Sequence, residues 1–307
     1  MIFLSGCGSL GFYDSSPLTK ERGKAPDKVK LDDFLPSWQP FAGNSSGLFY
    51  ASASIIEPKL ELRAIKANLS VDLSADLSRD ESQTSLKIVV NSRGGGEGKL
   101  PSIKVSSFVR NYGLLAGINA TPFDITSSKE GEERNCAGIV VSDGITISQP
   151  FDRYDAIVFY KDGSAAILPQ AEITSLEDVE NAVGGFRMVL KDGELAERLS
   201  RTKEVRHPRS AVGLSSDGRT LYLLVIDGRR SGSIGATEAE IALIMKKLGA
   251  ECALNLDGGG STAMALRLPN NRVKIVNTPI HKGIPGRERA VGACIGLAAV
   301  ENHKIVR

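Results

Sequence analysis

The chain has 307 residues, of which 41% are apolar and 24% charged, as in an ordinary globular protein. The 38 Lys and Arg residues nearly balance the 36 Asp and Glu residues, and a net charge of +2 provides no electrostatic footprint for nucleic acid or an anionic membrane surface. No apolar run approaches the roughly 20 residues of a membrane-spanning helix. We therefore expect a globular protein without a nucleic-acid partner.

The first 40 residues have the character of a membrane tether. Leu4-Ser5-Gly6-Cys7 resembles the cleavage box of a bacterial lipoprotein, in which Cys7 becomes the lipidated first residue. Only a few apolar residues precede the box, so this interpretation requires a start codon upstream of Met1; the alternative is a chance match in a disordered terminus. We predict a lipid anchor at Cys7, a flexible tether over 1–40 and a single domain over 41–307, in the periplasmic or extracellular part of a bacterial envelope.

The first half of the domain contains several short strand patterns. Partial alternation over 60–73 and the apolar run at 86–91 predict strands, and a further strand ends near Asn119. Ser106 is a candidate cap for a short helix before that strand. The loop 93–98 lacks the ending of a nucleotide phosphate loop, and we assign it no chemistry.

Four Asp-Gly pairs punctuate the middle of the chain. They lie at 143–144, 162–163, 192–193 and 217–218, each between β-rich runs. Asp-Gly supplies the positive φ angles that tight hairpin turns require, so we predict four hairpins, with calcium sites as the alternative. The cysteines show no CxxC spacing, which argues against zinc. Cys252 and Cys294 lie in apolar runs, which favours buried free thiols over a disulfide.

The last third of the chain reads as strand, helix, strand. An apolar strand over 221–227 is followed by Thr237 and Glu240, which fit a capping box at the start of a helix that Gly249 ends. A second apolar strand covers 252–257. This order predicts a right-handed βαβ unit with parallel strands. With the hairpins, it gives an α+β fold with mixed β-sheets.

An aspartate ends each strand of this unit. Parallel strands would place Asp227 and Asp257 at the same edge of the sheet, roughly 5 Å apart if the strands are neighbours and about twice that if one strand intervenes. Two carboxylates at such separations can divide acid and base or nucleophile roles in glycosyl cleavage. We take Asp257 as the key acid and Asp227 as its partner. The alternative is that either residue merely caps loop amides.

A glycine-rich loop and several cations follow the same strands. Gly258, Gly259 and Gly260 would let backbone amides approach an anionic oxygen, although three glycines also suit a tight turn. Ser261 and Thr262 add hydroxyls, and the helix start after Thr237 is another candidate anion site. Arginine can grip a phosphate through paired hydrogen bonds. The candidates near this edge are Arg209, Arg229, Arg230, Arg287 and Arg289. The loop residue His281 either contacts substrate or has no role.

These motifs resemble the phosphodiester glycosidase family. The matching segments are 208–213 (PRSAVG), 226–240 (IDGRRSGSIGATEAE), 248–250 (LGA), 255–262 (NLDGGGST), 277–279 (NTP) and 289–292 (RAVG). The resemblance extends over about 60–297 and is most specific in the last third. It implies an α+β domain that hydrolyses a sugar 1-phosphodiester to a free sugar and a phosphomonoester, without a cofactor, although a divalent cation is possible.

Carried over by position, the resemblance implies a site lined by Asn119, Arg209, Asp227, Thr237, Glu238, Asp257, Ser261, Thr262 and Arg289. We count Glu238 with the two aspartates as catalytic, and Asn255 with the glycine loop as substrate-binding. At 116–124 (AGINATPFD) the chain keeps Asn119 and Phe123 but has Ala120, Thr121 and Pro122 where the family has glycines. A tighter site there favours a different substrate, such as a cell-wall, teichoic-acid-like or exopolysaccharide phosphodiester.

Three other functions fit the same residues. A non-catalytic glycan-binding lipoprotein would need exposed aromatic platforms, and Trp38 is the sole tryptophan. A metal-dependent phosphoesterase would use Asp227, Asp257 and Glu238 as ligands of a divalent ion. A structural lipoprotein would retain the fold as a relic. A glycan-binding lipoprotein would release no product, and a metal-dependent phosphoesterase would lose its activity in the presence of a chelator.

Overall fold

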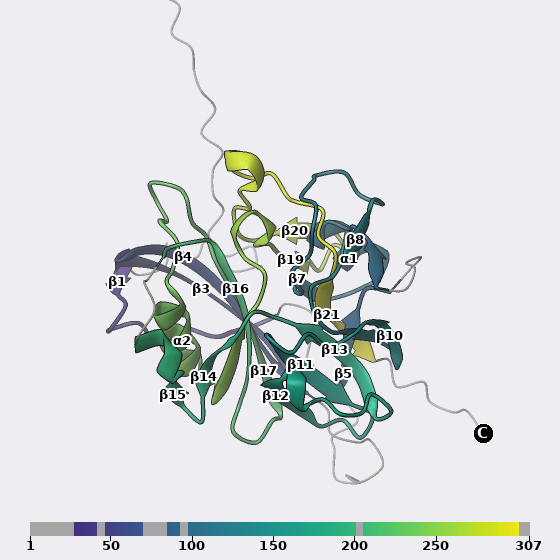
Figure 1. Ribbon diagram of the computed structural model, residues 1–307. Helices are drawn as coiled ribbons and strands as arrows, with labels where there is room; N and C mark the ends of the chain where they lie inside the picture. The colour runs from purple at the N-terminus through teal and green to yellow at the C-terminus, as the bar shows by residue number, and fades with distance from the viewer. Residues whose placement is uncertain (1–27, 42–46, 70–84, 93–97, 201–204, 301–307) are drawn as a thin grey trace, which may run out of the picture.

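The computed structural model describes residues 28–41, 47–69, 85–92, 98–200 and 205–300 (Figure 1). Cys7, most of the predicted tether and nearly all of the loop 93–98 lie outside these residues. Within them the chain forms mostly β-sheet, with two α-helices, Val105–Asn111 (α1) and Glu238–Leu248 (α2). The predicted α+β class therefore holds broadly, with a larger share of sheet than of helix.

The largest sheet carries the C-terminal motifs. Its strands in spatial order are β1 (Lys28–Lys30), β3 (Leu48–Glu57), β4 (Lys59–Asn68), β17 (Thr220–Ile226), β16 (Arg209–Leu214), β18 (Cys252–Asn255), β14 (Met188–Lys191) and β15 (Glu194–Leu195), with β2 (Gln39–Pro40) beside β3. All neighbours are antiparallel except β1 and β3. Figure 1 shows α2 lying against this sheet on the left of the view.

Packed structure is present before Phe41, the residue at which we predicted the domain to begin. β1 pairs with β3, and the side chains of Leu31 and Phe34 are buried in the core beneath the large sheet. Two apolar residues in an otherwise polar segment form no periodic pattern, so this packing leaves no local signal in the sequence.

Two smaller five-stranded sheets complete the domain. One contains β10 (Ile145–Ser148), β9 (Val140–Ser142), β13 (Val179–Gly184), β11 (Asp155–Tyr160) and β12 (Ala165–Pro169). The other contains β20 (Val273–Ile275), β19 (Met264–Arg267), β7 (Ala116–Asn119), β21 (Cys294–Val300) and β5 (Ser85–Val90). A short pair, β6 (Lys99–Pro101) and β8 (Glu133–Asn135), lies apart from both.

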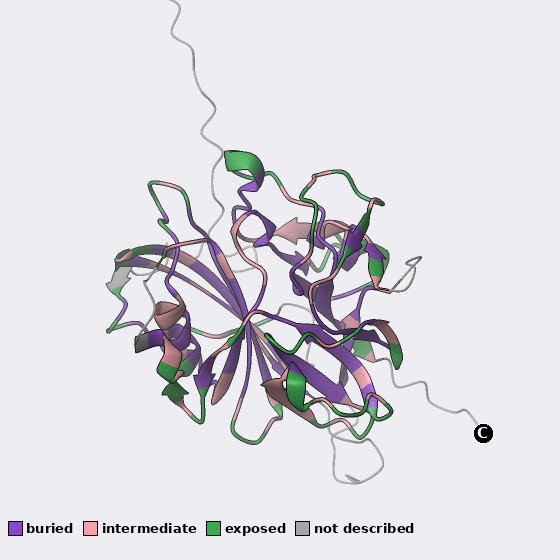
Figure 2. Ribbon diagram, viewed as in Figure 1, coloured by how far each residue is buried: buried purple, intermediate pink, exposed green. Residues whose placement is uncertain are grey.

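The nine-stranded sheet and the two five-stranded sheets share one hydrophobic core. Its largest apolar cluster joins residues from each of them, including Ile65 of β4, Ile157 of β11 and Ile118 of β7. Figure 2 shows this as buried residues concentrated where the strands converge near the centre of the view. The sheets are therefore held in fixed positions relative to one another, which allows loops from different sheets to form one site.

The four predicted hairpins are present. The Asp-Gly pairs join β9 to β10, β11 to β12, β14 to β15 and β16 to β17. At the first and third turns both residues have positive φ: 46° and 75° at Asp143 and Gly144, and 51° and 71° at Asp192 and Gly193. Turn geometry thus accounts for these aspartates, as predicted.

The predicted strand, helix, strand order is present, but the two strands do not pair. β17 and β18 are both antiparallel to β16, which lies between them, so they run parallel to one another with one strand intervening. The helix between them has the predicted capping box: Thr237 Oγ1 accepts from Glu240 N at 3.1 Å, and Thr237 N donates to Glu240 Oε2 at 2.9 Å. Gly249 ends the helix in the left-handed conformation, with φ of 108°.

Two smaller expectations have mixed outcomes. α1 begins at Val105 and not with a Ser106 cap; Ser106 Oγ instead donates to Glu288 Oε2 at 2.6 Å. Cys252 and Cys294 are free thiols as predicted, although Cys252 is only half-buried. No helix in the described ranges combines the length and apolar character needed to cross a bilayer.

We predict that Thr237→Ala lowers the free energy of unfolding by about 1 kcal/mol, because it leaves the Glu240 amide at the start of α2 without its cap. Urea denaturation measures the change. Thr237→Ser keeps the hydroxyl and should restore most of the loss. Equal stability of the alanine variant and the unmodified protein would show that the capping box does not stabilise the helix.

Candidate active site

The glycine-rich loop crosses from one sheet to another. It leaves β18 of the large sheet and enters β19 of a five-stranded sheet. The buried side chain of Asn119, at the end of β7, fixes the crossing: Nδ2 donates to the carbonyl of Asp257 at 2.6 Å, and Oδ1 accepts from Ser210 Oγ at 2.7 Å and from Ala263 N at 3.2 Å. Asn119 therefore positions the loop from beneath and does not line a cavity.

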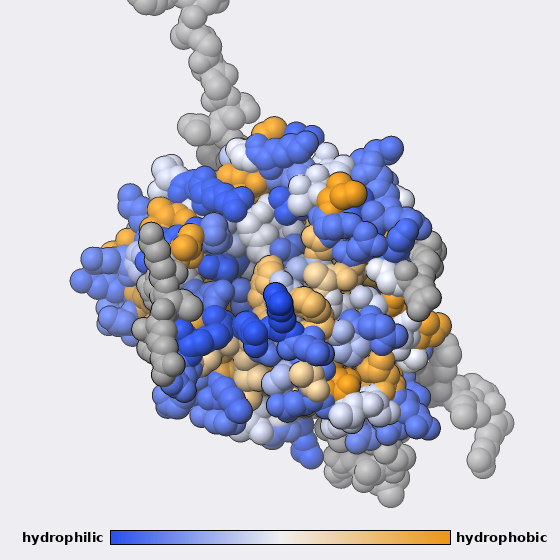
Figure 3. All heavy atoms as spheres, viewed as in Figure 1, coloured by the Kyte–Doolittle hydropathy of each residue, from blue (hydrophilic) through white to orange (hydrophobic). Residues whose placement is uncertain are grey.

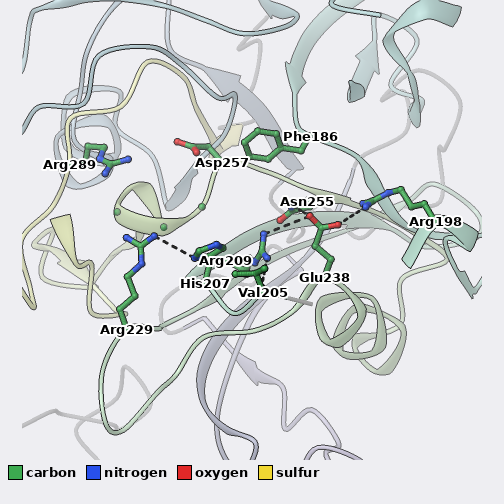
Figure 4. Close-up of a pocket in the computed structure, with 13 residues that line it drawn as sticks. Phe186, Arg198, Val205, His207, Arg209, Arg229, Glu238, Asn255, Asp257 and Arg289 are labelled. Atoms are coloured by element: carbon green, nitrogen blue, oxygen red, sulfur yellow. Dashed lines mark hydrogen bonds and ion pairs between the residues drawn. The ribbon is translucent and has the colours of Figure 1, made fainter. Parts of the chain in front are cut away.

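A cavity of about 530 Å³ lies over this loop (Figure 4). Segments far apart in the sequence contribute to its wall, which carries four arginines and two carboxylates. Its lining residues are Phe186, Arg198, Val205, His207, Arg209, Arg229, Glu238, Asn255, Asp257, Gly258, Gly259, Gly260 and Arg289. Nine of the residues predicted for the site from sequence are among them. Figure 3 shows that hydrophilic residues cover most of the side of the molecule turned to the viewer, with apolar residues in scattered patches.

Asp257 is the carboxyl group whose environment is most altered. Burial disfavours its charged form and raises its pKa to about 6; a hydrogen bond from Ser261, the positive charge of Arg289 and the Gly258 amide oppose this shift. The group is therefore largely protonated in mildly acidic solution and can donate a proton there. This is the property required of a general acid.

Arg289 is held beside Asp257 by residues that do not reach the cavity. Its Nε donates to His281 Nδ1 at 3.2 Å, and its Nη1 donates to Ser261 Oγ at 3.1 Å. His281 is fully buried, and burial together with the charges of Arg289, Arg287 and Lys282 lowers its pKa. Its neutral ring accepts at Nδ1, which places the proton on Nε2. His281 thus orients an arginine and does not contact substrate from this position.

Glu238 is the second carboxylate in the cavity. It is the first residue of α2 and accepts from Arg198 Nη1 at 2.6 Å and from Asn255 Nδ2 at 3.4 Å, with Arg209 Nη1 at 3.8 Å from Oε1. Arg209 is itself fixed by bonds to the carbonyls of Ala236 and Val205. Two arginines therefore lie against the Glu238 carboxylate and balance its negative charge.

Arg229 projects into the opposite side of the cavity. Its backbone has a positive φ of 58°, which is uncommon for a residue other than glycine, and its Nη2 lies 3.5 Å from His207 Nδ1. Among the described residues, neither Arg229 nor Arg289 has a carboxylate within ion-pair distance. Burial and the charges of Arg209 and Arg229 lower the pKa of His207. The two arginines are thus available for an anionic group in the cavity.

The glycine loop offers fewer backbone N–H groups to an anionic ligand than we predicted from the sequence. The amides of Asp257, Gly259, Ser261 and Thr262 already donate to protein carbonyls, at 3.0, 2.8, 3.2 and 3.4 Å. These bonds hold the loop in shape and leave those four N–H groups unavailable to a ligand. Anion recognition in this cavity falls mainly to the arginines.

A side chain at any of the three glycines would instead be sterically unfavourable. A Cβ on Gly258 would lie 2.8 Å from the carbonyl oxygen of Pro208, and Gly259 has a positive φ of 62°. A Cβ on Gly260 would collide with the guanidinium group of Arg289. The glycines therefore let the chain pass close to Pro208 and let Arg289 lie over the loop.

A family model described as phosphodiester glycosidase matches residues 112–298, which is more than half of the chain. The chain belongs to the phosphodiester glycosidase family. The matched range contains every residue that lines the cavity.

The fold of this phosphodiester glycosidase domain is also found in solved structures. The zebrafish N-acetylglucosamine-1-phosphodiester alpha-N-acetylglucosaminidase catalytic domain, auto-inhibited by its pro-peptide, has a TM-score of 0.59 and 19% identity, covering 86% of this chain and 88% of that one. A hypothetical protein from Synechocystis has a TM-score of 0.56 and 16% identity, covering 83% and 62%. A putative exported protein from Burkholderia pseudomallei has a TM-score of 0.50 and 16% identity, covering 78% and 74%.

One curated relative is similar in sequence. An uncharacterized SPbeta prophage-derived protein, YomE of Bacillus subtilis (strain 168), is 28% identical over 140 residues, which are 42% of this chain and 22% of that protein. The similarity thus spans about a fifth of the length of that relative.

Asp227 does not line the cavity of this phosphodiester glycosidase domain. It is 2% exposed; its Oδ1 accepts from Asn277 Nδ2 at 3.0 Å and from Thr278 N at 2.9 Å, and its Oδ2 accepts from Arg230 Nη2 at 2.9 Å. Asp227 thus fixes the Asn-Thr-Pro segment and Arg230. The pairing of Asp227 with Asp257 in one cavity, as we predicted, is not what the structure shows; Glu238 is the second carboxylate there.

The other predicted residues lie around the cavity. Thr237 caps α2, Ser261 bonds both Asp257 and Arg289, and Thr262 is buried in the loop. Sequence reasoning missed Phe186, Arg198, Val205 and His207, which the sheets bring together from separate segments. His207 precedes the matching PRSAVG segment, which was the one available signal.

We predict opposite stability changes for the two aspartates. Asp227→Asn should cost roughly 3 kcal/mol, because it removes the buried partner of Arg230 and presents an amide group to Thr278 N. Asp257→Asn should stabilise the protein near pH 7.5, where the native carboxyl is ionised although its desolvation disfavours the charged form. Because its pKa is about 6 folded and about 3.8 unfolded, stability falls as pH rises between these values, and the gain from asparagine shrinks toward pH 4.

Urea unfolding of both variants at pH 7.5 and pH 4 measures these effects. Asp178→Asn, at an exposed position, is the control. Destabilisation by Asp257→Asn at pH 7.5 would show that Asp257 is a stabilising structural carboxylate like Asp227.

Proposed function

We propose that this protein is a hydrolase that cleaves the sugar C–O bond of a sugar 1-phosphodiester and releases a free sugar and a phosphomonoester. The observation that carries the proposal is the partly buried Asp257 carboxyl, with a pKa of about 6, at a cavity wall that also carries two arginines without carboxylate partners in the described residues. The family and the fold support it, because the zebrafish relative is an N-acetylglucosamine-1-phosphodiester alpha-N-acetylglucosaminidase.

The cavity suggests a role for each group. Arg229 and Arg289 would hold the phosphate by paired hydrogen bonds. Asp257 would donate a proton to the leaving phosphate oxygen, which needs less proton help than an alcohol, so an acid with a pKa near 6 is sufficient. Glu238, rather than Asp227, would act as base toward water or as nucleophile at the sugar carbon.

The rival mechanisms differ in which groups they need. A metal-dependent phosphoesterase would gather Asp227, Asp257 and Glu238 around one ion, but the described residues contain no group of three or more His, Cys, Asp or Glu side chains that could hold a metal ion. Asp227 instead bonds the loop at Asn277 and Thr278. The observed positions therefore favour cleavage by Asp257 and Glu238.

We further propose that the substrate is a phosphodiester of the bacterial envelope, such as a teichoic-acid-like or exopolysaccharide linkage. The motivating features are the cleavage box at Cys7, which lies outside the described residues, and the replacement of glycines by Ala120, Thr121 and Pro122. One structural relative is a putative exported protein of Burkholderia pseudomallei, which agrees with such a location.

Hydrolysis of a panel of sugar 1-phosphodiesters in oxygen-18 water tests the reaction. We expect the label in the sugar, and kcat/KM that falls as pH rises through about 6, because Asp257 then loses its proton. Asp257→Asn should lower turnover at least ~100-fold, the usual share of a general acid, while Asp178→Asn has no effect. Label in the phosphate, or full turnover by Asp257→Asn, would contradict the assignment.

A further inference from the structure

A second cavity, of about 460 Å³, lies beside the hairpin of β9 and β10. Phe151, whose side chain is 42% exposed, forms part of its wall together with Thr146, Ser148, Gln149 and the backbone of Gly138. None of the described residues that line it is charged. This separates it from the arginine-rich cavity over Asp257 and fits a neutral polar ligand better than an anion.

Three aromatic rings connect the two cavities. Phe151 contacts Tyr154 with ring centroids 5.0 Å apart, and Tyr154 contacts Phe186 at 5.4 Å, both edge to face. Phe186 lines the first cavity, and Figure 4 shows its ring extending toward Asp257. We call Phe151, Tyr154 and Phe186 the aromatic ridge. It is partly exposed along its length, so it presents a continuous surface from one cavity to the other.

The aromatic ridge is held in place by a buried amide. Gln170 is 1% exposed; its Oε1 accepts from Phe151 N at 2.8 Å and from Ile139 N at 2.9 Å, and its Nε2 donates to the Asp155 carbonyl at 3.0 Å. A Cβ on Gly184 would lie 2.7 Å from Gln170 Nε2, so glycine leaves the room that the amide occupies.

The other end of the ridge is bonded to the candidate active site itself. Phe186 N donates to the carbonyl of Asn255 at 2.8 Å, and Phe186 O accepts from Asp155 N at 3.3 Å. Asn255 lines the first cavity and contacts Glu238. The ridge and the candidate catalytic groups therefore form one rigid surface, which is the condition for binding a long ligand without a large ordering cost.

We propose that the second cavity is a subsite for a neutral sugar unit, so that the substrate is a glycan chain of several units and not a single sugar phosphodiester. The electronegative, apolar face of an aromatic ring packs against the C–H groups of a pyranose, while the sugar hydroxyls reach hydroxyl and amide groups nearby. Phe151 and Gln149 supply these two kinds of contact. The inference rests on the proposed function for the reaction, but sugar binding can be measured without it.

The binding experiment uses the unmodified full chain and free trisaccharides from chitin, cellulose, starch and mannan, titrated by calorimetry. We expect at least one trisaccharide to bind more tightly than its monosaccharide. Phe151→Ala should weaken that binding by about 2- to 10-fold, as for a lost aromatic contact, and Phe151→Trp should retain it. Leu35→Ala, which removes an apolar side chain that is 80% exposed and lies outside both cavities, is the matched control.

The kinetic experiment compares phosphodiesters that carry one or three sugar units on either side of the phosphate. We expect a higher kcat/KM for the longer substrates. Phe151→Ala should remove this advantage of length, whereas Phe151→Trp and Leu35→Ala should retain it. Hydrolysis with no dependence on length or on residue 151 would overturn the subsite and leave the proposed function intact. Trisaccharide binding that depends on Phe151, without hydrolysis of any diester, would support the subsite and reject the proposed reaction. Absence of both would reject both.

Discussion

The site depends on one constraint: the loop after β18 must cross between two sheets at a fixed depth. Asn119 imposes this by bonding the Asp257 carbonyl, the Ser210 hydroxyl and the Ala263 amide with a single side chain. The crossing leaves Asp257 only partly exposed, with its carboxyl at the cavity wall. Because a buried carboxyl resists ionisation, its proton affinity follows directly from where the loop crosses.

The two aspartates that end β17 and β18 show how environment decides the use of the same residue. Asp227 receives three hydrogen-bond donors and joins a segment of loop to the sheet. Asp257 has fewer donors relative to its burial, and its pKa rises. A carboxyl group that is poorly stabilised when charged costs stability at neutral pH but is a useful acid.

The arginines divide into two kinds by the same reasoning. Arg198 and Arg209 interact with Glu238, and Arg230 pairs with Asp227, so their charges are largely used within the protein. Arg289 is oriented by His281 and Ser261, which are neutral, and Arg229 lies beside a neutral His207. Only arginines held by neutral groups keep their charge available for a phosphate. The protein thus directs positive charge to the Asp257 side of the cavity.

Local patterns predicted much of the fold. The Asp-Gly turns and the capping box at Thr237 need only near neighbours in sequence, and both are present. The burial of Leu31 and Phe34 could not be predicted, because it depends on pairing with β3. The region around Asp257 was found because the strand-end carboxyl, the three glycines and the two hydroxyl residues are consecutive in the sequence.

The rest of the site could not be read from strand ends alone. Asp227 does not share the cavity of Asp257 because the end of a strand does not specify which neighbours its carboxyl bonds, and Asp227 bonds Asn277 and Thr278. Phe186 lies between β13 and β14 and Arg198 lies in a 3-10 helix after β15, and no local signal connects either residue to the cavity. Contacts between distant segments were therefore the part that required the structure.

The proposed role of Asp257 requires that the folded protein keep this carboxyl protonated well above the usual pH range for aspartate. Titration of the full chain labelled with carbon-13 at aspartate carboxyls, with the Asp257 signal assigned by its absence in Asp257→Asn, measures this directly. We expect the titration midpoint of the Asp257 carboxyl to lie near pH 6. A midpoint at or below about 4, the value of an unperturbed aspartate, would contradict it.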